Sequence, residues 1–403
     1  MTLQHRARPW VLCAVAVAGV AVMAQSQGRI IESTLAGKKM FADQQMAALA
    51  VPFTGVRTAA GVTADLFPVK ATGVSTEPIR LAADAFLASL TATQSIRTVF
   101  AVDDAEWRRW SNVDNGLYVR QGVSLKEMTE PQRQAAMALM RVSLSAKGLA
   151  LTEAIRKTDQ TLREINDDAV RYDEQLYFFT MMGMPSRTEP WGWQIDGHHL
   201  VINYFVLGDQ VVITPVFMGG EPVVATTGKY AGNAVLQPEQ DLGLAFMRTL
   251  GQAQQSAATL RRDKPANDIQ AQADKDNLVL DYQGLRVAAL SAPLKARLRA
   301  LIALYVENLR DDQARVRMAE VEAHLDDTWF AWAGGTSDTD VFYYRIHSPV
   351  ILIEFDHQRP VGTRTINPPD RPTRAHIHVV VRTPNGNDYG KDLLRQHLVT
   401  HPH

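Results

Sequence analysis

The chain contains two runs, Val350-Ile351-Leu352-Ile353-Glu354-Phe355-Asp356 and Ala375-His376-Ile377-His378-Val379-Val380-Val381, in which polarity alternates with a period of two. This period is typical of β-strands with one buried face. Glu354 and Asp356 share a face of the first run, and His376 and His378 share a face of the second. Residues 357–374, between the runs, contain four prolines and predict a long irregular loop.

The two histidines suggest a metal site. Successive residues on one face of a strand lie about 6.6 Å apart, so His376 and His378 could bind the same ion. Together with Glu354 they would form a mixed nitrogen and oxygen site suited to zinc, iron, copper or manganese. Three further candidates for this cluster are His347, Asp356 and His357. Two alternatives stay open: hydrogen-bonded histidines on a half-exposed sheet, or Glu354 and a histidine as an acid/base pair without metal.

The composition excludes some classes of partner. The chain has 403 residues, with 42 basic and 43 acidic side chains and a net charge of -1. This balance argues against a nucleic-acid partner or an anionic membrane surface. The length allows two or three domains and a large core. The oligomeric state is left open.

The N-terminus has the layout of a secretory signal peptide. The basic residues His5, Arg6 and Arg8 precede an apolar run from Trp10 to Met23, and Ala24 offers a small residue for cleavage. We therefore expect residues 1–24 to be removed and the protein to be periplasmic or secreted; an uncleaved anchor is the alternative. The only cysteine, Cys13, lies in this segment, so the mature protein would contain no disulfide and no thiolate ligand. Residues 25–77 predict a poorly ordered or surface-wrapping lead-in.

The rest of the chain resembles itself. Residues 85–94 match residues 245–254 at an offset of 160 (245 − 85), with four identities. Residues 121–140 match residues 283–302 at an offset of 162 (283 − 121), and both contain Gln-Gly, a Ser or Thr N-cap and a proline in the first helical turn. A later strand run, residues 193–204, aligns with 344–355 at an offset of 151 (344 − 193). Chance similarity between alanine-rich helices is the alternative.

We therefore predict an α+β protein of two duplicated halves, each a helical part followed by antiparallel strands, related by a pseudo-twofold axis. The first half would span residues 78–237, and the second, with a C-terminal helix, residues 238–403. If one cleft lies between the halves, the first half would contribute His198, His199 and Asn203. Because adjacent residues of a strand point to opposite faces, at most one of the two histidines should join a site.

Two tryptophans offer a different type of site. Trp191 and Trp193 lie on one side of a predicted strand and could stack on a ring of a ligand, although packing in the core is the simpler interpretation. With Arg345 and Asn203 they are our candidate substrate-binding residues.

The sequence lacks the common catalytic motifs: no Gly-x-Ser-x-Gly elbow, no His-Glu-x-x-His, no Walker loop and no dinucleotide fingerprint. Several blocks together resemble the bacterial family known as domain of unknown function 3500. These blocks are residues 197–200, 342–346, 352–356, 376–378 and 387–397. The resemblance covers most of the chain from about residue 81 to 397. It implies an exported protein and no established activity.

The sequence leads to two functional hypotheses. The first is an exported metal-dependent enzyme, hydrolytic rather than redox, with His376, His378 and Glu354 as ligands. In it, Glu354 could instead act as general base, and His198 or His199 as a third ligand or acid. The second is a non-catalytic binding protein that holds a small molecule or peptide between its halves.

Overall fold

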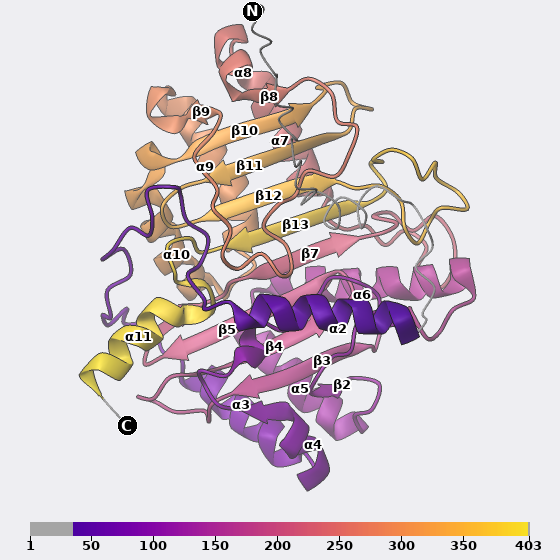
Figure 1. Cartoon of the computed structure of the whole chain (residues 1–403), viewed down its shortest axis with the longest axis vertical. Coiled ribbons are helices and arrows are strands. Elements are labelled where there is room, and N and C mark those ends of the chain that lie inside the picture. The colour runs from indigo at the N-terminus through magenta and orange to yellow at the C-terminus, as the bar shows by residue number, and fades with distance from the viewer. Residues whose placement is uncertain (1–34, 402–403) are drawn as a thin grey trace, which may run out of the picture. The chain divides into compact units, whose positions relative to one another are not determined.

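The structure, a computed structural model, describes residues 35–401 (Figure 1). Its first helices and strands are α2 (Leu35–Ala50), α3 (Glu77–Ser89), α4 (Ala92–Thr98), β1 (Val99–Phe100), β2 (Val123–Ser124), α5 (Glu130–Ser143), α6 (Ala146–Asn166), β3 (Tyr177–Met182), β4 (Trp191–Gly197), β5 (Leu200–Leu207), β6 (Gln210–Val212) and β7 (Val216–Gly220). The later ones are α7 (Gln237–Thr249), α8 (Gln252–Ala258), β8 (Thr259–Arg261), β9 (Leu285–Arg286), α9 (Ala292–Val306), α10 (Asp311–Ala323), β10 (Trp329–Gly334), β11 (Phe342–His347), β12 (Leu352–His357), β13 (Ile377–Arg382) and α11 (Lys391–Thr400).

The predicted signal segment, residues 1–24, lies outside the described residues. Within the described part of the chain, no helix combines the length and apolar character needed to cross a bilayer.

The described strands form one large mixed sheet, which confirms the α+β class. Its order is β1-β3-β4-β5-β7-β13-β12-β11-β10-β8. Three short strands pair outside this order: β2 with β3, β6 with β5, and β9 with β10. The long neighbouring strands are antiparallel, whereas β1 and β8 run parallel to β3 and β10. In the centre, β7 pairs with β13 in antiparallel register, with Met218 facing Val379.

The two faces of the sheet have different covers. Leu200 and Ile202 of β5 pack into the core formed with the long helices, whereas Val201 points to the opposite face. Figure 1 shows α6 and α9 behind the sheet and α2 in front of it. Alternation along each strand thus assigns its residues to a helical face or to a front face.

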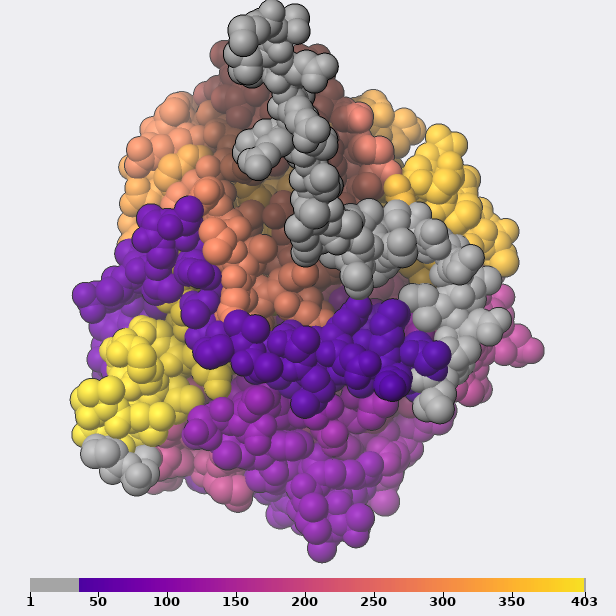
Figure 2. All heavy atoms as spheres, in the orientation of Figure 1, coloured from indigo at the N-terminus to yellow at the C-terminus, as the bar shows by residue number. Residues whose placement is uncertain are grey.

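On the front face, segments distant in sequence are tied together by Arg108. Its guanidinium forms a buried ion pair with Asp276 at 2.8 Å and donates to the carbonyl groups of Ala48 and Val51. Figure 2 shows α2 and atoms of the segment before β9 on this face. The lead-in after α2 runs along the surface, where Asn385 donates its backbone N–H to Val56 at 2.7 Å.

Two helices begin where the sequence predicts. Thr129 is the N-cap of α5 and Ser291 is the N-cap of α9, and each helix has a proline in its first turn. Pro fits the first turn because its missing N–H has no partner there in any helix.

The two Gln-Gly pairs also have matching environments. Gly122 and Gly284 have φ of +84° and +94°, in the region that favours glycine. A Cβ on Gly122 would lie 2.0 Å from the carbonyl oxygen of Phe179, and one on Gly284 would lie 2.3 Å from that of Phe330. Both glycines therefore let the chain cross the backbone of a neighbouring strand more closely than a residue with a side chain could.

Substitution of Gly284 tests this crossing. We expect Gly284→Ala to lower the free energy of unfolding by at least about 2 kcal/mol, because backbone strain and a clash with a carbonyl group add together. Gly61→Ala is the matched control, since Gly61 has φ of +99° but open space around its Cβ position. The control should cost only about 1 kcal/mol. Urea unfolding measures both, and equal losses would contradict the proposed clash.

Candidate functional site

Three buried imidazoles meet on the front face near the central strand pair. His199 lies in the turn between β4 and β5, His378 lies in β13, and His376 directly precedes that strand. The Nε2 atom of His376 is 3.3 Å from Nε2 of His199 and 2.9 Å from Nε2 of His378. We call these residues the trihistidine group. Their side chains could together hold a metal ion.

A glycine makes this approach possible. Gly219 belongs to β7, which lies between β5 and β13 in the sheet. It donates its N–H to the carbonyl of His199 at 2.8 Å and faces His378 in the ladder with β13. Facing residues of paired strands point to the same side of a sheet. A Cβ on Gly219 would lie 3.0 Å from Cδ2 of His199 and 3.2 Å from Cδ2 of His378. The missing side chain thus leaves the space in which the two rings meet.

The predicted long loop between β12 and β13 orients one of the rings. His376 donates its Nδ1–H to the carbonyl of Arg359 at 2.7 Å, and Glu221 lies 3.4 Å from the same nitrogen. This bond leaves the lone pair of Nε2 directed at the group, as in many metal-binding histidines. Glu221 in turn accepts backbone N–H bonds from Gly362 and Thr363 of the loop.

The electrostatic environment favours neutral imidazoles. Burial and the neighbouring histidines hold the pKa of His199 and of His378 well below the ordinary value. Burial also lowers the pKa of His376, although Glu221 opposes the shift. The neutral form is the one that binds metal ions. Burial acts to raise the pKa of Glu221, but His376 and the bonds from the loop outweigh it, so that pKa is lowered.

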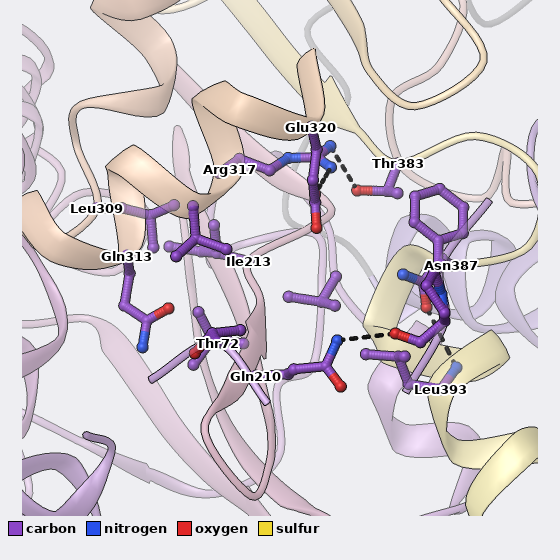
Figure 3. A pocket seen from close by; sticks show the side chains of 15 residues that line it. Thr72, Gln210, Ile213, Leu309, Gln313, Arg317, Glu320, Thr383, Asn387 and Leu393 are labelled. Atoms are coloured by element: carbon purple, nitrogen blue, oxygen red, sulfur yellow. Dashed lines mark hydrogen bonds and ion pairs between the residues drawn. The ribbon is translucent and has the colours of Figure 1, made fainter. Parts of the chain in front are cut away.

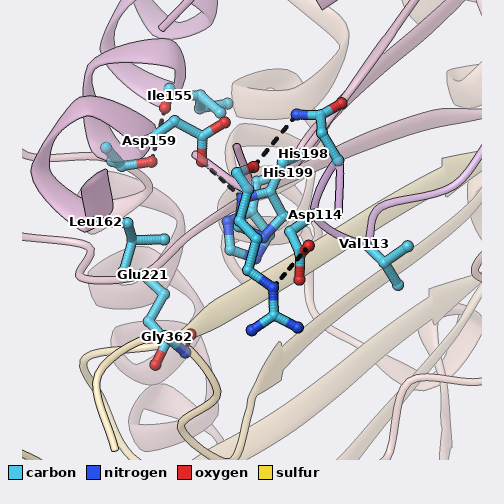
Figure 4. Close-up of polar contacts among 12 residues, drawn as sticks. Val113, Asp114, Ile155, Asp159, Leu162, His198, His199, Glu221 and Gly362 are labelled. Carbon is cyan, nitrogen blue, oxygen red and sulfur yellow. Dashed lines mark hydrogen bonds and ion pairs between the residues drawn. The ribbon is translucent and has the colours of Figure 1, made fainter. Parts of the chain in front are cut away.

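A fourth histidine, His198, pairs with a buried carboxylate beside the group. His198 shares a hydrogen bond of 2.6 Å between its Nδ1 and Asp159 of α6, and Tyr177 donates its hydroxyl to the same carboxylate at 2.9 Å. The ring of His198 stacks on His199 with centroids 3.9 Å apart. Burial acts to lower the pKa of His198, but Asp159 reverses this effect and the pKa is raised. Figure 4 shows Asp159, His198 and His199 together.

This pair is better described as an acid/base pair than as a second metal site. Asp159, His198 and His199 are close enough to be considered as ligands. However, the rings of His198 and His199 are stacked with an interplanar angle of only 24° and centroids 3.9 Å apart, so their in-plane lone pairs lie in two separate, nearly parallel planes. The direct bond to Asp159 also occupies Nδ1 of His198.

The structure does not bring Glu354 into the trihistidine group. Its carboxylate accepts N–H bonds from Gln270 and Ala271 and a hydroxyl bond of 2.6 Å from Tyr343. Asp356 likewise accepts the N–H groups of residues 268 and 269, in the segment between β8 and β9 that lies over the front face. Both carboxylates lie on the same sheet face as His378. They bind the backbone of the segment that covers this face and do not contribute to the trihistidine group.

The candidate substrate-binding residues lie in the interior, outside the group. Trp191 and Trp193 have no exposed surface, and Trp193 stacks on Tyr204 with centroids 5.3 Å apart. Asn203 bonds to Gln194 and to the carbonyl of Pro215. Arg345 is buried and donates to Gln283 at 2.9 Å. The tryptophans therefore offer no open stacking surface.

The remaining histidine candidates also lie elsewhere. Burial lowers the pKa of His347 to about 3, and its ring lies 4.6 Å from that of Tyr282. His357 accepts the N–H of Phe342 at 2.9 Å.

Sequence reasoning missed Asp159 and Glu221. Asp159 had a detectable signal, because with Ile155 and Leu162 it forms a buried stripe at helical spacing, where a lone carboxylate is unusual. Glu221 had none, since its partners are backbone amides of a distant loop.

Comparison with known proteins places the chain in one family. A family model described as a protein of unknown function (DUF3500) matches residues 72–391, so the chain belongs to this family. No curated protein and no solved structure matches it.

The role of Gly219 can be tested directly. If the trihistidine group holds zinc, Gly219→Ala should weaken that binding at least tenfold, because the added methyl would lie 3.0 Å from the ring of His199 and 3.2 Å from that of His378 and push them apart. Gly220→Ala is the matched control: its methyl would meet the side chain of Val235 at 2.6 Å instead. Both should lose about 1–3 kcal/mol of stability through overpacking. Equal zinc affinity in the two variants, measured by competition with a chromogenic chelator, would exclude this role.

The buried carboxylate of Asp356 predicts a pH dependence of stability. Burial raises its pKa to about 7, while an ion pair of 2.6 Å with Lys264 opposes the shift. Between its ordinary pKa and 7 the folded protein holds a proton that the unfolded chain has lost, so stability falls as pH rises through this range. The slope is at most about 1.4 kcal/mol per pH unit.

Asp356→Asn removes this contribution. The variant also removes one of the two carboxylates that pair with Lys264, whose ammonium group keeps Asp268 at 3.2 Å, and this loss lowers the stability of the variant. Urea unfolding from pH 4 to 8 should show a steeper decline in the wild type. Parallel curves for the two proteins would contradict the shift.

Proposed function

We propose that this member of the DUF3500 family is a metal-dependent hydrolase in which the trihistidine group binds one zinc ion. The proposal rests on the convergence of three Nε2 atoms. That of His376 lies 3.3 Å from Nε2 of His199 and 2.9 Å from Nε2 of His378. Tetrahedral zinc with bonds of 2.0–2.1 Å would separate its nitrogen ligands by about 3.3 Å. The nitrogen ligands argue against magnesium and calcium, which prefer oxygen, whereas iron and copper remain in the class that imidazole suits.

The number of ligands favours catalysis over a structural role. Structural zinc sites are closed by four protein ligands, whereas catalytic sites have three and keep one position for water or substrate. A zinc ion bound in this way acts as a Lewis acid and lowers the pKa of its water to about 7.

His198 supplies the acid/base function in this proposal. Asp159 fixes its Nδ1, so its Nε2 is available to take or give a proton. Its Nε2 has no hydrogen-bond partner within the described part of the chain. The stacking on His199 keeps the ring beside the group. This arrangement of an acid, an oriented histidine and an adjacent reaction site is common in hydrolytic enzymes.

We also propose that the site lies between two duplicated halves related by a pseudo-twofold axis through the β7–β13 pair. The sheet order supports this. Going outward from that pair, β5, β4, β3 and β1 on one side correspond in position to β12, β11, β10 and β8 on the other. In the ladders, Trp193 faces Tyr204 and Tyr344 faces Phe355, at one offset (344 − 193 = 355 − 204 = 151). In this arrangement His199 comes from the first half, and His376 and His378 come from the second.

Export remains part of the proposal. It is supported by the basic and apolar layout of residues 1–24. A zinc site made only of histidines is also compatible with an oxidising compartment, because it contains no thiolate.

Metal content tests the assignment. Full-length wild-type protein should hold about one equivalent of zinc by elemental analysis, and its melting temperature should fall on chelation. His199→Ala and the double variant His376→Ala/His378→Ala should lose the metal. Glu354→Gln is the control and should keep it, because backbone amides occupy that carboxylate. Metal retained by His199→Ala but lost by Glu354→Gln would instead support a site on Glu354.

Hydrolysis is tested separately. The zinc-loaded protein should cleave at least one substrate in a panel of activated carboxylic, phosphate and sulfate esters. His198→Asn should reduce kcat at least about a hundredfold while retaining zinc, as expected for loss of a general acid or base. Stoichiometric zinc with no turnover across the panel would contradict the hydrolase assignment.

A further inference from the structure

A hollow lies on the helical face of the sheet, opposite the face that carries the trihistidine group. It is lined by apolar side chains from the central strands and from the helices behind them, including Leu200, Val216, Met218, Val306 and Ile351. Protein interiors are close-packed, so an apolar hollow beneath a sheet is unusual. An apolar space of this kind favours an apolar ligand over water.

The hollow continues into a more polar groove, shown in Figure 3. The groove lies between β6, α10 and α11, and its polar lining includes Gln210, Gln313 and Thr383. Three residues line both spaces: Ile213, Leu309 and Arg317. The two therefore adjoin, with an apolar interior, a polar mouth and Arg317 at the junction.

Arg317 can accept an anionic group at this junction. It donates to the carbonyl of Val350 at 2.6 Å, to the hydroxyl of Thr383 at 3.1 Å and to Glu320 at 2.8 Å. A guanidinium group has five N–H donors, so these contacts leave donors for a ligand. The pair with Glu320 is partly exposed, with side-chain exposures of 15% and 32%, and such a pair exchanges partners at little cost.

An unpaired amide adds a second observation. Gln313 is 1% exposed, yet its side-chain nitrogen has no hydrogen-bond partner among residues 35–401. Buried polar groups are nearly always satisfied, so an orphan donor lining the groove indicates a ligand acceptor or an ordered water. Together with Arg317 it places hydrogen-bond donors at the mouth, beside apolar side chains such as Val212 and Leu393.

We propose that these joined spaces bind a small aliphatic carboxylate, its chain in the apolar hollow and its carboxylate at Arg317 and Gln313. The charge of Arg317 selects an acid over the matching alcohol, and it opposes an amine. The apolar lining selects a chain over a compact anion such as acetate. The trihistidine group lies on the other face of the sheet, so this site does not depend on the proposed hydrolase function.

Ligand series on the wild-type protein provide the first test. Isothermal titration of the full chain with butyrate, pentanoate and hexanoate should show affinity rising about fourfold per added CH₂. Hexanol and hexylamine should bind at least tenfold more weakly than hexanoate. Equal affinity for acid and alcohol, or no binding of hexanoate, would overturn the proposal.

A pair of variants provides the second test. Arg317→Met keeps an apolar stem and should reduce hexanoate affinity at least tenfold while leaving that for hexanol unchanged. Arg315→Met is the matched control, since Arg315 is an exposed arginine of the same helix and should have no effect. If Arg317→Met unfolds the protein, Gln313→Leu replaces it, with the same selective loss expected. Unchanged acid affinity in a folded variant would rule out this role for the junction.

Discussion

The antiparallel pairing of β7 with β13 is the interaction on which the rest of the structure depends. It joins the strands of residues 99–220 and 259–382 into one sheet. It also determines which side chains become neighbours across the join. Because Gly219 faces His378, and its N–H bonds to the carbonyl of His199, two histidines 179 residues apart (378 − 199) share one row of the sheet. A register shifted by one residue would turn His376 and His378 toward the helices.

The segments that cover the front face are fixed by buried carboxyl groups that accept backbone N–H groups. Glu221 holds the loop at Gly362 and Thr363, and Glu354 and Asp356 hold residues 268–271. A carboxyl group that accepts several backbone donors is satisfied without a metal, and Asp356 also pairs with Lys264. This explains why carboxylates close to the histidines in the sheet are not available to them. The carboxylates fix the loops, and the loop at Arg359 then orients His376.

The sequence predicts some of these features for clear physical reasons. Alternation in β12 and β13 placed Glu354, Asp356, His376 and His378 on one sheet face, and the structure places them there because period two is a property of each strand alone. The paired N-caps and glycines were also visible, since they depend on local backbone conformation. Local rules thus identified the elements and their polar faces.

Partner choice could not be predicted in the same way. Alternation shows which face a carboxylate is on, but not that backbone amides 84 residues away (354 − 270) will reach it. The exact start of the C-terminal helix is a further example: α11 begins at Lys391, since Tyr389 has φ of +59° and Asp388 accepts the backbone N–H of Thr383. His198 and His199 lie in a turn with stacked rings, so alternation does not apply to them.

The energetics of the trihistidine group support a functional origin. Nδ1 of His199 and Nδ1 of His378 are buried without hydrogen-bond partners among the described residues. An unsatisfied buried polar group costs about 1–3 kcal/mol, and an apolar ring of similar size would avoid that cost. Stability alone therefore does not explain three imidazoles at this position. Binding of an ion to the native state alone would offset the cost, because such binding stabilises the fold in proportion to the logarithm of ion concentration over Kd. The unfavourable burial and the converging Nε2 atoms thus have a common explanation in a ligand shared by all three rings.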